Sequence, residues 1–179
     1  MILAISGPQG GGKDTIGEGL AEIFEADVDR FARNLYAMCA TVDPVFHPKM
    51  AHADKDDWVL GRPELGTRRA FLEKLGTEFG RDMIHPNLWT LLTLERGTLL
   101  PRILVDCRFD SEAEAVREIG GLVIHLRPDW TSFGRRHASD FPIAVRPGDI
   151  VMKLTEGNYE ADLERLASMV ADNYKADAR

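Results

Sequence analysis

A glycine-rich segment near the amino end, Gly-Pro-Gln-Gly-Gly-Gly-Lys-Asp-Thr at residues 7 to 15, constrains this chain more than any other feature. It follows a short apolar run at residues 2 to 5, of the kind that a buried parallel strand needs. Behind it, apolar residues recur at three- and four-residue steps from Ile16 to Phe24, which predicts a helix. Strand, turn and helix in this order predict an α/β unit that binds an anion where the helix begins.

The spacing from Gly7 through Gly12 to Lys13 fits the pattern G-x-x-x-x-G-K, in which the lysine reaches the outer phosphates of a nucleoside triphosphate. The alternative is a glycine-rich turn between strand and helix that binds nothing. The residues predicted to contact ATP and its phosphates are Gly7, Gln9, Gly10, Gly11, Gly12, Lys13, Asp14 and Thr15.

Asp14 departs from this pattern, because Ser or Thr usually stands there and supplies a hydroxyl to magnesium. A carboxylate in contact with phosphate would be repelled. We therefore interpret Asp14 as turned toward the water shell of Mg²⁺ or toward a basic neighbour, and Thr15 as the hydroxyl near the phosphates. Both residues would hold the metal indirectly, through water.

Composition limits the classes of protein that remain. A length of 179 residues with 44% hydrophobic content suits one domain with a sizeable core. The net charge of -7 argues against a broad surface for nucleic acid, and we expect no such partner. Two cysteines, Cys39 and Cys107, indicate neither a disulfide scaffold nor a metal site. No apolar run reaches membrane-spanning length, so we expect a cytoplasmic protein, a monomer or a homodimer.

Further buried-strand patterns occur at residues 103 to 106 and 122 to 126, with shorter ones at 26 to 29 and 149 to 152. Helical periodicity recurs at residues 31 to 38, 67 to 83, 88 to 94, 111 to 119 and from about 158. This alternation predicts an α/β fold, a three-layer α/β/α arrangement with a mainly parallel five-stranded sheet. The segment from 41 to 66 is predicted to be an irregular surface connection, and its His47 and His52 to be solvated rather than metal ligands.

Asp106 and Arg108 follow the strand predicted at residues 103 to 106. Ligands of parallel sheets collect beyond the carboxyl ends of the strands, so these charges are predicted to share a crevice with the glycine-rich loop and to orient the acceptor of the reaction. The alternative is a surface ion pair. His125 is interpreted as a satisfied histidine rather than a catalyst, because nothing pairs it with a nucleophile.

The twenty residues from 127 to 146 hold four arginines, a histidine, a glycine and two prolines. So many arginines after a core strand, in an acidic chain, predict a lid that closes over phosphates, in which Arg135 and Arg136 would stabilise the transferring phosphoryl group. A mobile basic loop is the alternative. No Ser-His-Asp or Cys-His arrangement accompanies the cradle, which favours phosphoryl transfer, with Lys13, Asp106 and Arg108 as its other catalytic residues.

Four motifs carry a resemblance to a known family. They are Gly-Lys-Asp-Thr in the cradle, Leu-Gly-Thr-Glu-Phe-Gly-Arg at 75 to 81 before Trp89, Asp-Cys-Arg-Phe at 106 to 109 before Glu112-Ala113, and Gly120-Gly121 before a strand. In this order they resemble the bacteriophage deoxynucleoside monophosphate kinases, over nearly the whole chain.

The resemblance implies a single P-loop kinase domain over residues 1–179, in which a core of 1–29, 98–126 and 147–179 carries an acceptor-binding helical region at about 30–97 and a lid at about 127–146. It implies Mg²⁺-ATP as phosphoryl donor and a nucleotide, a (deoxy)nucleoside monophosphate, as acceptor in the host cell cytoplasm. The predicted acceptor-binding residues are Arg33, Arg69, Glu73, Arg81, Asp106 and Arg108. Glu73 stands where the family pattern has Gln, and Thr155 where it often has Asn, so the base preference stays open.

Other functions stay open from the sequence. Phosphomevalonate kinases share the Gly-Lys-Asp cradle and an Asp-x-Arg strand end, so a small phosphorylated acceptor that is not a nucleotide is one alternative. An ATP-dependent switch that passes phosphate only to water is another, and a purely structural protein is a third. The arginines in the helical region also have two interpretations: they bind phosphate bidentately, or they are exposed partners of nearby glutamates.

Overall fold

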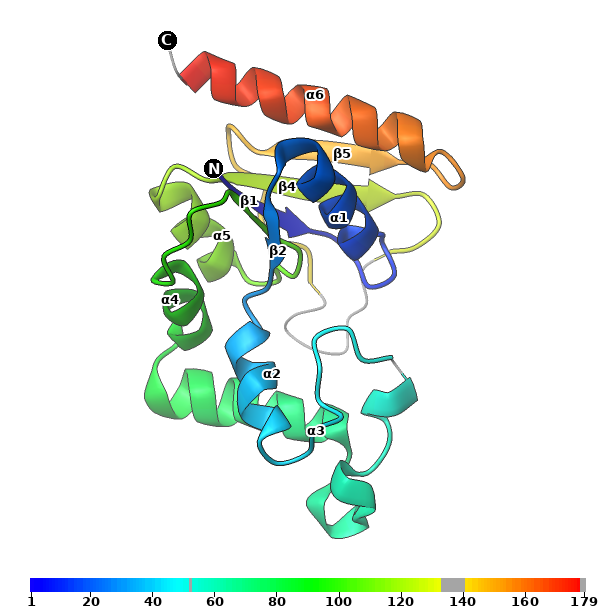
Figure 1. The fold of residues 1–179 in the computed structure, drawn as a ribbon, viewed down its shortest axis with the longest axis vertical. Coiled ribbons are helices and arrows are strands. Elements are labelled where there is room, and N and C mark those ends of the chain that lie inside the picture. Colours follow the sequence, from blue (N-terminus) through cyan, green and yellow to red (C-terminus); the bar gives the residue numbers. More distant parts are fainter. Residues whose placement is uncertain (52, 133–140, 178–179) are drawn as a thin grey trace. The chain divides into compact units, whose positions relative to one another are not determined.

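The computed structural model of this chain describes residues 1–51, 53–132 and 141–177. The chain divides into two compact units (Figure 1). The first comprises Met1–Asp29 and Thr98–Arg179, and the second comprises Arg30–Gly97. Each unit has a hydrophobic core of its own. Whether the chain acts as a single kinase domain stays a prediction. Among the described residues, no helix combines the length and apolarity needed to cross a membrane.

The first unit is built on a five-stranded sheet whose neighbouring strands are all parallel. Its strand order is β2-β3-β1-β4-β5, so the strand before the glycine-rich loop occupies the centre. The strands are β1 (Ile2–Ser6), β2 (Asp27–Asp29), β3 (Arg102–Leu104), β4 (Leu122–Pro128) and β5 (Ile150–Leu154). β1 and β4 are buried along most of their length, as a central parallel strand must be when helices cover both of its faces.

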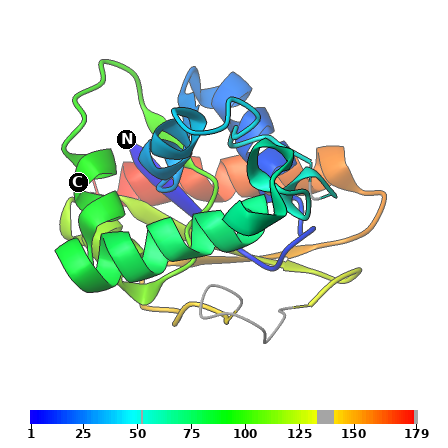
Figure 2. The same ribbon diagram turned by 90° about the horizontal axis from the view of Figure 1, so that it is seen from below.

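One face of this sheet holds the main core. Alternate residues of each strand point to it, as with Leu3 and Ile5 of β1. Two helices cover it, α1 (Lys13–Phe24) and α6 (Tyr159–Asp177), which pack against each other and lie on the same side of the sheet (Figure 2). The core residues Ile16, Leu20, Leu166 and Val170 come from these helices.

The opposite face is covered by α5 (Asp110–Glu118), which contacts β1 and β4. Its Ala113 and Val116 are fully buried, as are Ala4 and Val123, which alternate with the core-facing positions of the strands. These layers confirm the predicted α/β fold with a five-stranded parallel sheet. Two boundaries differ from the prediction: β3 ends at Leu104, before Asp106, and β4 continues to Pro128, past the start of the predicted lid.

The second unit is helical. It contains α2 (Arg33–Ala40), α3 (Arg68–Glu73) and α4 (Leu88–Leu94), and α3 continues into a π-helical segment at Lys74–Ile84. One regular helix was predicted over most of this span. The apolar residues of this span recur at steps of three and four residues, which indicates an α-helix, so the spacing did not reveal the wider i→i+5 turn. The buried core residues are Leu35, Tyr36, Cys39, Phe46, Val59 and Trp89.

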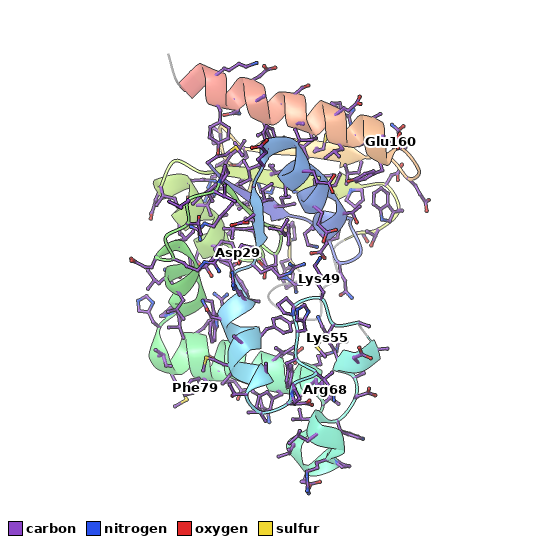
Figure 3. All side chains as sticks on the ribbon, viewed as in Figure 1. Asp29, Lys49, Lys55, Arg68, Phe79 and Glu160 are labelled. Carbon is purple, nitrogen blue, oxygen red and sulfur yellow. The ribbon has the colours of Figure 1, made fainter. Side chains whose placement is uncertain are left out.

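The described part of the segment at residues 41 to 66, which leaves out His52 and therefore the prediction made for it, is irregular, as predicted. It contains short 3-10 turns at Ala53–Lys55, Val59–Gly61 and Pro63–Leu65. The prediction that it runs along the surface is wrong for Asp43, which is 2% exposed. Its carboxylate accepts hydrogen bonds from the Leu60 backbone N–H at 3.0 Å and from Arg68 Nε at 2.8 Å. Arg68 lies in α3 within the second unit (Figure 3). The buried Asp43 carboxylate, which accepts several hydrogen bonds, anchors this segment. The composition of the segment does not predict which donors reach this carboxylate.

Candidate phosphate-binding site

The glycine-rich loop between β1 and α1 has backbone angles that residues with a side chain rarely adopt. Gly10 and Gly12 have φ angles of 70° and 76°, in the left-handed region that favours glycine. Gly12 is the residue that precedes the first turn of α1. At Gly7, a Cβ atom would lie 3.3 Å from the Leu126 carbonyl oxygen. The loop therefore needs glycine both for its turns and for its close approach to β4.

Lys13 folds back over this loop. Its Nζ donates hydrogen bonds to the carbonyl oxygens of Gly7 at 2.9 Å and Pro8 at 2.7 Å. Burial and, to a lesser extent, the charge of Arg108 lower the pKa of Lys13 to about 8, although the carboxylates of Asp14 and Asp106 oppose the shift. The ammonium is thus poorly solvated, and two carbonyl oxygens of the loop accept its hydrogen bonds.

Two residues that follow β4 donate to the next two carbonyls of the loop. Trp130 Nε1 donates to Gly10 O at 3.0 Å, and Thr131 Oγ1 donates to Gln9 O at 3.3 Å. The indole also lies beside Gly12, where a Cβ atom would come within 3.8 Å of the ring. Sequence reasoning missed both residues, since no local pattern signals a hydrogen bond to backbone that lies about 120 positions earlier in the chain.

Asp14 and Thr15 stand in the first turn of α1, and both are exposed. The backbone N–H groups of such a turn have no acceptor within the helix and form its positive end, which favours an anion. The carbonyl oxygen of Thr15 accepts a hydrogen bond from the Tyr159 hydroxyl at 3.0 Å, so the beginning of α6 supports the beginning of α1.

Asp106 and Arg108 come directly after β3. The Cys107 N–H donates to Ile5 O at 3.2 Å, which holds this corner at the carboxyl end of β1, where the loop begins. The charges of both residues act on the pKa of Lys13, Arg108 lowering it and Asp106 raising it. The structure therefore brings Lys13, Asp106 and Arg108 together, while their catalytic roles stay predictions.

Glu112, which was not predicted as a site residue, shapes the same corner. Its buried carboxylate accepts hydrogen bonds from the backbone N–H groups of Arg108 at 2.8 Å and Phe109 at 3.2 Å, at the beginning of α5. An acidic residue three positions after the residue that precedes a helix is a recognised capping signal, so the spacing from Phe109 to Glu112 could have revealed it.

The other residues predicted to bind the acceptor belong to the second unit. Arg33 begins α2, Glu73 ends α3, and Arg81 lies in the π-helical segment. Arg69 pairs with Asp56, with 2.8 Å between Nε and Oδ1, and Arg81 Nη1 donates to Pro86 O at 3.3 Å. Both arginines have partners within their own unit, and the prediction that they bind an acceptor stays a prediction.

The lid arginines are described only in part. Arg135 and Arg136 lie outside the described residues, as does the segment from His137 to Asp140. Arg146 is described, and its Nε lies 3.1 Å from Glu114 Oε1 on α5. Arg127 donates to its neighbour Leu126 O at 3.3 Å. The predicted lid is therefore neither established nor contradicted.

His125 is fully buried in β4 and makes a structural contact. Its Nε2 lies 2.8 Å from Asp149 Oδ2, and the same carboxylate accepts two hydrogen bonds from Arg117, at 3.0 and 2.8 Å. Burial lowers the pKa of His125 while Asp149 opposes that shift, so the ring is neutral at pH 7. Nδ1 has no partner among the described residues, so the interpretation of a satisfied histidine holds for one ring nitrogen only.

A cavity of about 270 Å³ lies beside this cluster, at the amino end of β4. Arg117, Leu122 and Tyr174 are among its lining residues, and none of the predicted site residues lines it. Across residues 1–51, 53–132 and 141–177, no three His, Cys, Asp or Glu side chains are grouped so that they could hold a metal ion directly. A metal at the loop would accordingly need phosphate oxygens or water as its other ligands.

Comparison with known proteins adds little to this geometry. No protein-family model matches the chain, and no curated protein matches it. Among solved structures, the chain is similar to an unliganded sugar kinase from Janibacter sp. HTCC2649, with 15% sequence identity and a TM-score of 0.45. The match covers 95% of this chain and 94% of the other. A likeness at this level carries no argument about substrate or reaction.

Proposed function

We propose that this protein transfers the terminal phosphoryl group of Mg²⁺-ATP to a small phosphorylated acceptor, a (deoxy)nucleoside monophosphate, giving the diphosphate. One observation carries the proposal: the ammonium of Lys13 is held at the carbonyls of Gly7 and Pro8, within a glycine-rich loop that enters α1. Asp106 and Arg108 stand beside it. In the pattern G-x-x-x-x-G-K, the backbone N–H groups of the glycine-rich loop and the lysine that follows it bind the phosphates of a nucleotide.

The residues of the loop fit a bound triphosphate. The carbonyls of Gly7, Pro8, Gln9 and Gly10 all accept hydrogen bonds from side chains of this protein, so their negative ends are compensated before any anion arrives. The N–H groups of the first helical turn lack intrahelical acceptors and would bind phosphate oxygens. The exposed Asp14 and Thr15 would hold Mg²⁺ through its water shell, and that ion would neutralise charge on the phosphates.

Phosphoryl transfer demands positioning and charge compensation rather than covalent catalysis. Lys13 would leave its two carbonyl partners and bind the outer phosphates. The poorly solvated ammonium would then have a fully charged partner in place of two carbonyl dipoles. Arg108 would add positive charge beside it, and Asp106 would orient the acceptor. Arg135 and Arg136 would close the site against water, and Arg33, Arg69, Glu73 and Arg81 would bind the acceptor. These assignments belong to the proposal.

A coupled assay of ADP formation tests it, run with Mg²⁺-ATP and each nucleoside or deoxynucleoside monophosphate in turn, with phosphomevalonate, and with no acceptor. We expect turnover that depends on a nucleotide acceptor and that Lys13→Ala abolishes. Turnover with phosphomevalonate alone would replace the acceptor in this proposal with a non-nucleotide one. A slow rate that ignores every acceptor would contradict a kinase and leave an ATP-dependent switch.

A further inference from the structure

Two side chains that lie next to each other in the sequence donate hydrogen bonds to the backbone of the glycine-rich loop at residues 7 to 15, here called the phosphate loop. Trp130 and Thr131 follow β4, and they donate to the carbonyls of Gly10 and Gln9 at 3.0 and 3.3 Å. Asp129 fastens the same segment to the end of β5, since its N–H donates to Leu154 O at 3.1 Å. The donors therefore project from an anchored strand end.

A loop of this composition needs such support. Three consecutive glycines, Gly10 to Gly12, lose more conformational entropy on ordering than other residues would. A peptide that flips at Gly10 would aim a carbonyl oxygen at the bound phosphates, where it would repel them. The Trp130 bond fixes the direction of that carbonyl, and the indole lies close enough to Gly12 that a Cβ atom added there would come within 3.8 Å of the ring.

Lys13 cannot fix the loop in the same way. Its bonds to Gly7 and Pro8 must break when the ammonium turns to a phosphate, so they hold the loop only while the site is empty. The bonds from Trp130 and Thr131 compete with no ligand of Lys13 and can persist in both states.

We infer that Trp130, assisted by Thr131, is a positioning residue that keeps the phosphate loop in its binding conformation. The inference rests on the proposed function, in that the ligand of the loop is the phosphate chain of a nucleotide. Trp130 acts through the loop backbone and needs no contact with the base or with the reacting atoms.

The test measures the dissociation constants of Mg²⁺-ADP and of inorganic tripolyphosphate for the full chain, by calorimetry. Tripolyphosphate reports the loop alone, because it carries no base. Trp130→Phe keeps an aromatic ring and removes the N–H, so both ligands should bind more weakly by a similar factor, roughly two- to tenfold for one neutral hydrogen bond. Thr131→Val, which lacks the hydroxyl, should also weaken the binding of both ligands. Thr131→Ser, which keeps the hydroxyl, should bind them as the unaltered protein does.

Trp58→Phe is the matched control, because Trp58 is an exposed tryptophan of the second unit, and we expect no change in either constant. The melting temperature of each unliganded variant shows whether folding is intact. If Trp130→Phe does not fold, the comparison of Thr131→Val with Thr131→Ser decides the question.

Unchanged dissociation constants for both ligands in Trp130→Phe and Thr131→Val would overturn the inference and leave the proposed function unaffected. Weaker binding of ADP alone would overturn it too, because the indole would then contact the base. Failure of the unaltered protein to bind either ligand would overturn the proposed function together with this inference.

Discussion

Lys13 Nζ lies 2.7 Å from the carbonyl oxygen of Pro8, and this hydrogen bond places a partly buried ammonium inside the loop that we propose to bind phosphate. Backbone carbonyl dipoles and two nearby carboxylates, Asp14 and Asp106, compensate a cation in that position. An incoming polyphosphate would offer it full negative charges. The unliganded site is therefore electrostatically prepared for an anion.

The first prediction concerns the charge of Lys13. Lys13→Ala should lower ADP formation at least about a hundredfold, since removing one donor that stabilises developing charge costs that much in other enzymes. The coupled assay measures it. Lys175→Ala is the control, because Lys175 is exposed near the end of α6 and should leave the rate unchanged. Equal rates in the two variants would remove Lys13 from the mechanism.

The second prediction follows from the pKa of Lys13, which burial lowers to about 8 in the unliganded protein. A bound polyphosphate raises that pKa, so binding takes up a proton when the pH lies above 8. Affinity for Mg²⁺-ADP should therefore be constant below pH 8 and fall above it, by up to tenfold per pH unit. Calorimetric titrations of Mg²⁺-ADP from pH 7 to 9.5 test this, in a range where a terminal phosphate with a pKa near 6 is already ionised. A flat profile would contradict the shift.

The third prediction concerns the buried ion pair of the second unit. Arg68 Nε lies 2.8 Å from Asp43 Oδ2, and the two side chains are only 10% and 3% exposed. Arg68→Met removes one partner and leaves a buried carboxylate uncompensated, so it should lower the free energy of unfolding by about 3–5 kcal/mol. Urea denaturation measures this change.

Arg62→Met offers a matched control for that pair. Arg62 pairs with Glu64 at 3.4 Å, but both side chains are about two-thirds exposed. Its loss should change the free energy of unfolding by about 0–1 kcal/mol. Similar changes in the free energy of unfolding for Arg62→Met and Arg68→Met would show that the buried pair contributes no more to stability than the exposed one.

The fourth prediction tests the packing of the π-helical segment. A Cβ atom on Gly80 would come within 2.5 Å of the Trp89 ring, which is itself buried. Gly80→Ala should therefore destabilise the protein by about 1–3 kcal/mol, the usual range for overpacking, although alanine favours a helix. Gly97→Ala is the control, because nothing lies within 4 Å of its added Cβ. Thermal melting of both variants checks the difference.

The fifth prediction concerns His125, whose pKa burial lowers below its ordinary value of 6.5. The native state then binds fewer protons than the unfolded state, so stability is full above pH 6.5 and falls as the pH decreases toward the native pKa. The slope cannot exceed about 1.4 kcal/mol per pH unit for one proton. In His125→Gln this slope should flatten, as measured by urea denaturation between pH 5 and 7.5. An equal slope in the variant would assign the titration to another group.

Local patterns accounted for the central strands and for the loop. The run at residues 2 to 5 is fully apolar and short, and the spacing after Gly12 repeats with the period of a helix, so periodicity alone indicated β1 and α1. Asp106 was placed near the loop by a rule about the carboxyl ends of parallel strands, which needs only the assignment of the strands. The buried Asp43 escaped the same reasoning, because its ring of donors is assembled from three separate segments.

The sequence by itself therefore determined the α/β fold, the parallel sheet and the position of the glycine-rich loop, because these depend on the order of apolar residues and glycines along the chain. Only the tertiary structure decided which groups hold that loop. Trp130 reaches Gly10 across some 120 positions, and Lys13 turns toward Gly7 and Pro8. Contacts between distant segments depend on how strands and helices pack, and no local pattern records that packing.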